Sequence, residues 1–277
     1  MISDDINPPA VEPPLNQPPV SAAALVPEDI RVPWDWIDLV IFALLAVGGT
    51  FVVSIGLVFA FSAFHVSMAQ LRTSASIKTY FAVLNQVVLS FVLIGFMALQ
   101  VRARAPVPFW RSVGWRGLET GRTPKPVAYA GLVAGGMLLS MLVEFASNIS
   151  RPKTLPIEAF FQDRRSALLL MVVSVVFAPF LEETIFRGYL YPALARALGI
   201  TPSVIVTGTL FGVMHAPQLW GGWLQIALLV LVGILFTYAR AATRTVVTSY
   251  ILHLSYNSFL LLGFLISSHW FQAMPRH

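Results

Sequence analysis

The chain lacks cysteine and has little charge, and each absence excludes a class of protein. Only 11% of its 277 residues are charged, whereas soluble domains carry about a quarter. The hydrophobic fraction is 57% and the mean hydropathy is +0.75, so an ordinary soluble globular domain is excluded. With no cysteine, the chain cannot contain a disulfide scaffold, a thiolate nucleophile or a cysteine-ligated zinc or iron–sulfur site.

The first 33 residues differ from the rest because they hold eight of the nineteen prolines. Proline pairs recur every five residues from Pro8-Pro9 to Pro18-Pro19, with acidic residues among them. Such a segment has too few apolar clusters to offset its ordering entropy. We therefore predict a disordered Pro-rich tail over residues 1–33, which acts as a spacer or as a docking ligand. It lacks the basic and apolar regions of a signal peptide, so we expect it to be retained.

Residues 34–277 form one predicted transmembrane domain, which begins at an aromatic pair, Trp34 and Trp36, expected at the membrane interface. Crossing a hydrocarbon core of ~30 Å takes about 20 helical residues. We predict an all-α, polytopic transmembrane helix bundle of about seven spans, with six to eight allowed because the fifth is short and polar. The spans are Leu39–Phe61, Tyr80–Val101, Val127–Ile149, Ala167–Ile185, Val204–Trp220, Trp223–Ala239 and Val246–Ser267.

Basic residues between the spans indicate the orientation. The segment from Arg102 to Lys125 contains six basic residues and one acid, Glu119, which is typical of a cytoplasmic loop. The N-terminus is then cytoplasmic as well, and the inner side carries eleven of the eighteen Lys and Arg residues if Arg187 is counted. We interpret the net charge of +5 as basic loops at anionic headgroups and predict no nucleic-acid partner.

Two adjacent glutamates indicate where the chemistry lies. Glu182 and Glu183 are the only acids in the 114 residues after Asp163, and they lie in an apolar span, where a charge costs at least ~2.5–3.5 kcal/mol. Glu183 can pair with Arg187 four residues later. Glu182 is rotated by about 100° from Glu183 on a helix, so it is less neutralised and is suited to take a proton from water.

Two roles stay open for this group of charges. Both glutamates could instead share Arg187 in a structural cluster, and Arg187 could either hold Glu183 or meet a substrate carboxylate. Pro179, one turn before the glutamates, is expected to kink the helix and to free a backbone carbonyl that only a protein or aqueous cavity could satisfy.

Two of the five histidines lie within predicted spans. His215 follows Phe211 by one helical turn, so the phenyl ring can pack beside the imidazole. His253 and Asn257 are four residues apart, and both can donate hydrogen bonds to a developing oxyanion. Depth estimates allow one cavity shared with Glu182 near the midplane. The remaining histidines, His65, His269 and His277, are expected to be solvated.

Two local patterns suggest packing rather than chemistry. Gly208, Gly212 and Ala216 form a small-residue stripe that allows another helix to approach closely. The segment Gly188–Leu198 is too short to span and has leucines at helical spacing, so we predict a separate interfacial helix that ends at Gly199.

In chain order, these residues form three motifs: Glu182-Glu183-x-x-x-Arg187, Phe211-x-x-x-His215 and His253-x-x-x-Asn257. Together, in this order and in successive spans, they resemble the CPBP (Abi) intramembrane protease family, which includes the type II CAAX prenyl endopeptidases and proteins linked to bacteriocin processing or immunity. The resemblance covers about residues 167–267.

The resemblance implies a metal-independent glutamate protease without a cofactor. Glu182 with His215 would activate the water, His253 and Asn257 would stabilise the oxyanion, and Glu183, Arg187 and Phe211 would support them. The partners would be the lipid bilayer and a membrane-associated peptide or protein, prenylated if CAAX-like. The expected location is the inner membrane of a bacterium, with the N-terminus in the cytoplasm.

Three alternatives accompany this interpretation. Glu182, His215 and His253 could supply three zinc ligands, although no HExxH motif is present. The chain could be a non-catalytic immunity or scaffold protein. It could also be a small transporter that uses an intramembrane acid as a proton site. Glu144, flanked by Ser140 and Asn148 one turn away, best fits the transporter, unless it makes a single hydrogen bond between helices.

Overall fold

A computed structural model describes residues 27–150, 155–160, 163–267 and 269, and these residues form helices and no strand. Six of the helical runs are long and apolar enough to cross a membrane. The helices are α1 (Trp36–Ala63), α2 (Met68–Thr73), α3 (Ala75–Arg104), α4 (Phe109–Ser112), α5 (Lys125–Ser147), α6 (Arg164–Val172), α7 (Ala178–Glu183), α8 (Tyr191–Leu198), α9 (Ile200–Met214), α10 (Trp223–Thr243) and α11 (Val246–Ser267). Short 3-10 helices lie at Glu28–Ile30 and Pro156–Phe160, and π-helical turns at Val173–Phe177 (η4) and Thr184–Leu190 (η5).

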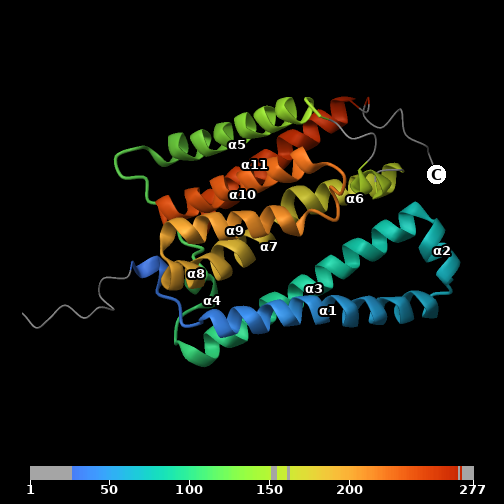
Figure 1. Ribbon diagram of the computed structural model, residues 1–277, viewed down its shortest axis with the longest axis horizontal. Coiled ribbons are helices and arrows are strands. Elements are labelled where there is room, and N and C mark those ends of the chain that lie inside the picture. Colours follow the sequence, from blue (N-terminus) through green and yellow to red (C-terminus); the bar gives the residue numbers. More distant parts are fainter. Residues whose placement is uncertain (1–26, 151–154, 161–162, 268, 270–277) are drawn as a thin grey trace, which may run out of the picture.

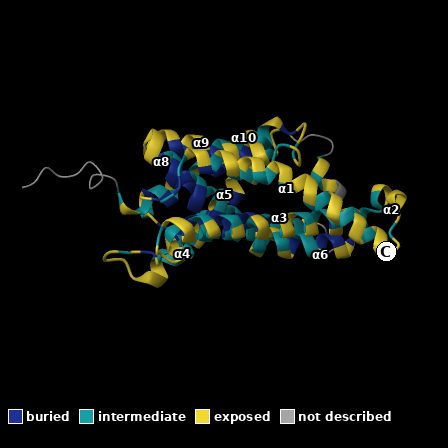
Figure 2. Cartoon of the chain, turned by 90° about the horizontal axis from the view of Figure 1, so that it is seen from below, coloured by how far each residue is buried: buried dark blue, intermediate teal, exposed yellow. Residues whose placement is uncertain are grey.

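The long helices run side by side along the length of the molecule (Figure 1). Helices α1 and α3 pack as one antiparallel pair, α5 packs on α11, and α9 packs on α10. The run from α6 to α8 lies between these groups and contacts α3, α9 and α11. Most residues of α1 are exposed (Figure 2), and only 6% of its most apolar window is buried within the protein, as expected for a helix that meets lipid.

The fold class is confirmed, and the described residues contain six candidate spans, at the lower end of the predicted range of six to eight. The fifth predicted span, Val204–Trp220, is instead the 15-residue helix α9, which stops at Met214. At 1.5 Å per residue such a helix is about 22 Å long, which is shorter than the hydrocarbon core. The last span was predicted with the same bounds that the structure gives, Val246–Ser267.

The helix predicted at Gly188–Leu198 is present and ends at Gly199, but it continues the fourth span and is not a separate element. Residues Arg164–Leu198 form one continuous helical run of 35 residues, in which η5 leads directly into α8. Gly188 does not break the helix but allows close packing, since a Cβ atom there would lie 2.6 Å from the carbonyl oxygen of Val113. Helix α8 packs on α9, and its Tyr191 and Ala195 are buried.

The segment before α1 is packed against the bundle. Trp34 was predicted at the membrane interface but is fully buried, because its indole Nε1 donates to the Tyr189 carbonyl at 2.9 Å and its ring stacks on that of Tyr189. Of the predicted aromatic pair, only Trp36 is exposed, at 65%. Val32 is also buried in this cluster, so the predicted tail contains packed residues near its end, whereas residues 1–26 lie outside the described part of the chain.

Side-chain caps fix two of the helix starts. The Asp35 side chain accepts hydrogen bonds from the amides of Ile37 and Asp38 at the start of α1, and the Asp38 carboxylate accepts one from the Asp35 amide. The Asp163 side chain caps α6 by accepting hydrogen bonds from the amides of Arg165 and Ser166, and it also accepts one from Ser76 of α3 at 2.8 Å. Burial opposes ionisation of Asp163, but the hydrogen bonds from Ser166, Arg165 and Ser76 outweigh it and lower the pKa of this carboxyl.

Candidate active site

One cavity of about 550 Å³ brings together the side chains that the sequence pattern singled out. It lies between α3, α5, α9, α10, α11 and the run from α6 to α7. Its lining includes Glu182, Phe211, His215, His253 and Asn257. Of the other three histidines, His65 and His269 are exposed and do not line the cavity, and His277 lies outside the described residues.

Glu182 reaches this cavity from a short stretch of α-helix between two π-helical turns. Helix α7 contains only Ala178–Glu183, with η4 before it and η5 after it. π-turns insert an extra residue into a helix and are common at functional sites. They rotate the residues between them relative to a regular helix. The Glu182 side chain stays 21% exposed, while its neighbour Glu183 is fully buried.

Glu183 and Arg187 form the expected i,i+4 ion pair, with 2.9 Å between Oε1 and Nη1, and both side chains are fully buried. Arg187 also donates from Nε to Thr237 at 3.2 Å and from Nη2 to the Gly233 carbonyl at 2.8 Å. Its guanidinium lies 4.4 Å from the centre of the Phe211 ring. Because Arg187 does not line the cavity, this geometry favours its role in holding Glu183 over a role in meeting a substrate.

Two imidazoles face the Glu182 carboxylate from different helices. His215, at the end of α9, places Nε2 3.8 Å from Glu182 Oε1. His253, on α11, places Nε2 3.8 Å from Glu182 Oε2. These separations are longer than direct hydrogen bonds, but each pair is close enough for one water molecule to contact both atoms.

The second nitrogen of each imidazole is held by an acceptor. His215 Nδ1 lies 2.8 Å from the Phe211 carbonyl oxygen, which can only accept, so Nδ1 carries the hydrogen. His253 Nδ1 lies 2.9 Å from Glu183 Oε1, the oxygen that Arg187 also contacts. A neutral imidazole in either place therefore presents an Nε2 lone pair to the cavity. Protonation of either ring would turn its Nε2 into a donor.

A hydrogen bond holds the Asn257 side chain, and this bond depends on the helix distortion that was expected at Pro179. In η4 the Ala178 amide donates to the Val173 carbonyl, five residues back. The same pattern would pair the Ser174 carbonyl with residue 179, but proline has no N–H. Asn257 Nδ2 donates to that carbonyl instead, at 2.8 Å. One N–H of the Asn257 amide then remains for another acceptor.

The small-residue stripe on α9 packs against α10. A Cβ atom on Gly208 would lie 2.4 Å from the amide nitrogen of Ile234, and one on Gly212 would lie 2.6 Å from that of Val230. This contact brings α9, with Phe211 and His215, against the helix that holds Arg187 through Thr237 and Gly233.

Several polar residues that line the cavity were not indicated by the sequence patterns, namely Ser174, Gln86, Gln218 and Gln225. Glu144, which the sequence did indicate, lines the cavity as well. Gln86 interrupts an apolar run on α3, so its polarity could have indicated it, whereas Gln218 lies in the irregular segment after α9 and gave no periodic signal. Near Glu144, the Ser140 and Asn148 side chains donate to backbone carbonyls.

Within the described part of the chain, no group of three or more His, Cys, Asp and Glu residues is arranged to hold a metal ion. The three groups named for a zinc site, Glu182, His215 and His253, share the cavity but meet at 3.8 Å contacts.

Comparison with known proteins gives one match. Residues 164–259 match the family model described as type II CAAX prenyl endopeptidase Rce1-like. The match begins at the start of α6 and ends in α11, so it contains all three motifs. No curated protein and no solved structure matches the chain.

Proposed function

We propose that this chain, whose residues 164–259 belong to the Rce1-like CAAX protease family, is an intramembrane endopeptidase that hydrolyses its substrate with a water molecule activated by Glu182. The observation that carries the proposal is the meeting of one carboxylate with two imidazole Nε2 atoms, each at 3.8 Å, in a cavity among apolar helices. A base, a water-binding site and oxyanion donors are the groups that peptide hydrolysis requires.

In the proposed reaction, Glu182 takes a proton from a water molecule that the His215 Nε2 lone pair also holds. The water oxygen forms a bond to the peptide carbonyl carbon, and the carbonyl oxygen becomes an oxyanion. When the C–N bond breaks, the proton on Glu182 passes to the leaving nitrogen. The products are a new carboxyl group and a new amine, so all atoms of the water are accounted for.

The oxyanion would be stabilised by His253 and Asn257. His253 can donate from Nε2 only when the ring is doubly protonated, because Nδ1 is directed at Glu183. Glu183 supplies the negative charge beside that cation, and Arg187 holds Glu183 in place. Asn257 would contribute the amide hydrogen that Ser174 does not use.

The cavity suits a substrate with a large apolar group. Aliphatic and aromatic side chains such as Val83, Leu170, Leu229 and Phe236 line it together with the polar groups. Helices α3 and α5, which both contribute to the lining, also expose apolar residues to the surroundings, for example Phe91 and Phe145 at 64% and 75%. These features support a membrane-associated or prenylated peptide as substrate.

A direct test uses the full chain in liposomes with an internally quenched peptide that ends in a farnesylated CAAX sequence. Mass spectrometry of the products would locate the cleaved bond, and the same peptide without the farnesyl group is the matched control. We expect hydrolysis of the farnesylated peptide and much slower hydrolysis of the control. Folded wild-type protein that cleaves neither peptide would contradict the CAAX-type proposal.

Metal independence is tested in the same assay. The proposed mechanism uses no metal ion, so turnover should survive a chelator such as EDTA, and the active protein should contain no stoichiometric zinc. Loss of turnover that returns on addition of zinc would instead support the zinc alternative.

One observation favours a second candidate function, a proton-coupled transporter: Glu144 lines the same cavity as Glu182, and intramembrane acids commonly carry protons. Proton-coupled flux into liposomes that is abolished by Glu144→Ala, and not by Glu182→Gln, would support the transporter. Hydrolysis that depends on Glu182 would support the protease.

A further inference from the structure

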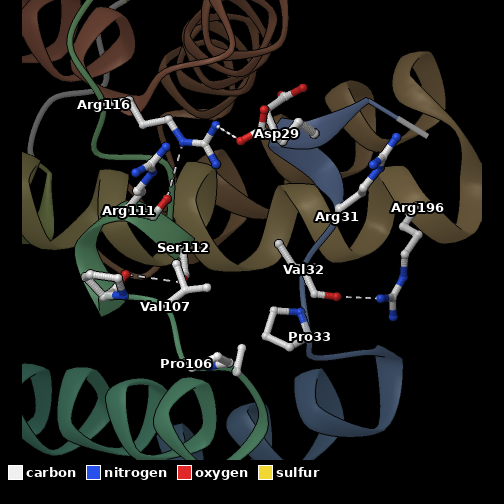
Figure 3. Close-up of a pocket in the computed structure, with 13 residues that line it drawn as sticks. Asp29, Arg31, Val32, Pro33, Pro106, Val107, Arg111, Ser112, Arg116 and Arg196 are labelled. Carbon is white, nitrogen blue, oxygen red and sulfur yellow. Dashed lines mark hydrogen bonds and ion pairs between the residues drawn. The ribbon is translucent and has the colours of Figure 1, made fainter. Parts of the chain in front are cut away.

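A second cavity, of about 700 Å³, lies at the end of the bundle where α1 begins and α3 ends. Three separate segments build it (Figure 3): the residues before α1, the connection from α3 to α5 that includes α4, and helix α8. No part of the proposed reaction uses this cavity. Four arginines line it, namely Arg31, Arg111, Arg116 and Arg196.

The arginines outnumber the acids in the lining, and both acids are already paired. Glu28 contacts Arg116 at 3.0 Å, and Asp29 contacts the buried Arg240 at 2.9 Å. These two pairs leave Arg111 and Arg196 without a carboxylate from within the lining. The cavity is therefore cationic.

Arg196 and Arg111 form no ion pair with another described residue, although Arg196 lies close enough to Asp38 to interact with it electrostatically. Arg196 donates to the backbone carbonyl of Val32 (Figure 3) and to that of Trp34, and neither carbonyl carries a formal charge. In the described part of the chain the Arg111 guanidinium has no ion pair, although its backbone carbonyl accepts a hydrogen bond from Arg116. Figure 3 shows the Arg111 side chain directed toward Arg116. Like charges placed together in this way attract an anion.

The position along the helices corresponds to the membrane surface. The cavity residues Pro33 and Ala105 lie next to the ends of the spans α1 and α3, and Arg196 is two residues from the end of α8. Two tryptophans at the same ends, Trp36 and Trp110, are 65% and 43% exposed, as is typical of side chains at headgroup level. A ligand in the cavity would therefore lie among lipid headgroups.

We infer that this cavity binds the phosphate group of an anionic phospholipid. Guanidinium groups match the tetrahedral oxygens of phosphate with paired N–H donors, and basic pockets between transmembrane helices bind acidic headgroups. A phosphate held by Arg111 and Arg196 would join α4 to α8. Because Arg196 also holds the segment before α1, the bound lipid would stabilise that segment on the bundle.

The test compares the thermal stability of the full chain in nanodiscs of phosphatidylcholine alone and of phosphatidylcholine with phosphatidylglycerol, and measures lipid retention by native mass spectrometry. Inorganic phosphate added to the phosphatidylcholine sample separates a free anion from a lipid headgroup. The main variant is Arg111→Gln, which removes an exposed cation and no described ion pair. The matched control is Arg122→Gln, the same change on the same connection but outside the cavity.

We expect phosphatidylglycerol to raise the melting temperature of the wild type and to remain bound, with retention about tenfold weaker or more in Arg111→Gln and unchanged in Arg122→Gln. Arg196→Lys, which keeps the charge but loses the paired donors, should also weaken retention. Equal losses in Arg111→Gln and Arg122→Gln would show general attraction and overturn the site. Protection by inorganic phosphate equal to that by the lipid would overturn the headgroup assignment.

Discussion

Asn257 and Ser174 lie 83 residues apart in the chain, yet the side-chain amide of Asn257 donates a 2.8 Å hydrogen bond to the backbone carbonyl of Ser174. The bond exists because Pro179 cannot supply the N–H that this carbonyl would otherwise receive within the π-helical turn. A helix distortion on the Glu182 segment thus determines where the side chain of Asn257 lies.

We predict that Pro179→Ala lowers kcat with little change in KM, because the restored amide competes with Asn257 for the Ser174 carbonyl. Loss of one oxyanion donor costs about 10²–10³ in kcat, and we expect that range for Asn257→Ala and a smaller loss for Pro179→Ala. The measurement is steady-state cleavage of the farnesylated peptide. The double variant should be no slower than Asn257→Ala alone, and additive losses would argue against this link.

Glu183→Gln should destabilise the protein strongly, because it leaves the buried Arg187 guanidinium without its counter-charge. Removal of one partner of a buried ion pair typically costs about 3–5 kcal/mol. Replacement of both partners, in Glu183→Gln with Arg187→Met, should restore much of the melting temperature. Activity should stay low in the double variant, since His253 still lacks a carboxylate at Nδ1. Recovery of activity together with stability would limit Glu183 to a structural role.

Gly208→Ala should loosen the contact between α9 and α10, because the new methyl group would lie 2.4 Å from the Ile234 amide nitrogen. Overpacking of this kind typically costs about 1–3 kcal/mol. Thermal unfolding in detergent would measure the loss. Gly56→Ala is the control on an exposed face, since a Cβ atom there meets nothing within 4 Å. Equal stability of the two variants would contradict the close helix contact.

Asp163 should make the stability of the protein depend on acid pH. A carboxyl whose pKa is lowered by folding stabilises the native state above its ordinary pKa of about 3.9, and this contribution is lost as the pH falls through the lower value of the folded state. Asp163→Asn should therefore be less stable than the wild type at about pH 6, and the difference should shrink toward about pH 3. A difference that does not change with pH would indicate that the charge of Asp163 does not matter.

Much of the fold could be predicted from local sequence patterns. The apolar runs gave the six long spans, and the bounds of Val246–Ser267 were predicted correctly because polar residues flank that run. Local patterns failed to predict the positions of residues that tertiary contacts determine. Trp34 is buried by Tyr189, which lies 155 residues later in the chain, and Gly188 allows a close contact with Val113, which is 75 residues earlier in the chain.

In the candidate site too, local patterns predict some contacts, whereas tertiary packing determines the others. The Glu183–Arg187 pair follows from helical spacing alone and is present at 2.9 Å. The contact between Glu183 and His253 joins positions 70 residues apart, so no periodicity could indicate it. Gln218 reaches the cavity from an irregular segment, where position in space depends on how α9 and α10 pack.

The most direct test of the account is the turnover of Glu182→Gln with the farnesylated peptide in liposomes, measured beside its melting temperature. Glutamine keeps the shape of the side chain but cannot take a proton, and loss of a general base typically costs about 10²–10⁴ in rate. We predict that loss with an unchanged melting temperature, whereas Glu158→Gln, at an exposed position outside the cavity, should cleave like the wild type. Wild-type turnover by folded Glu182→Gln would contradict the proposed mechanism.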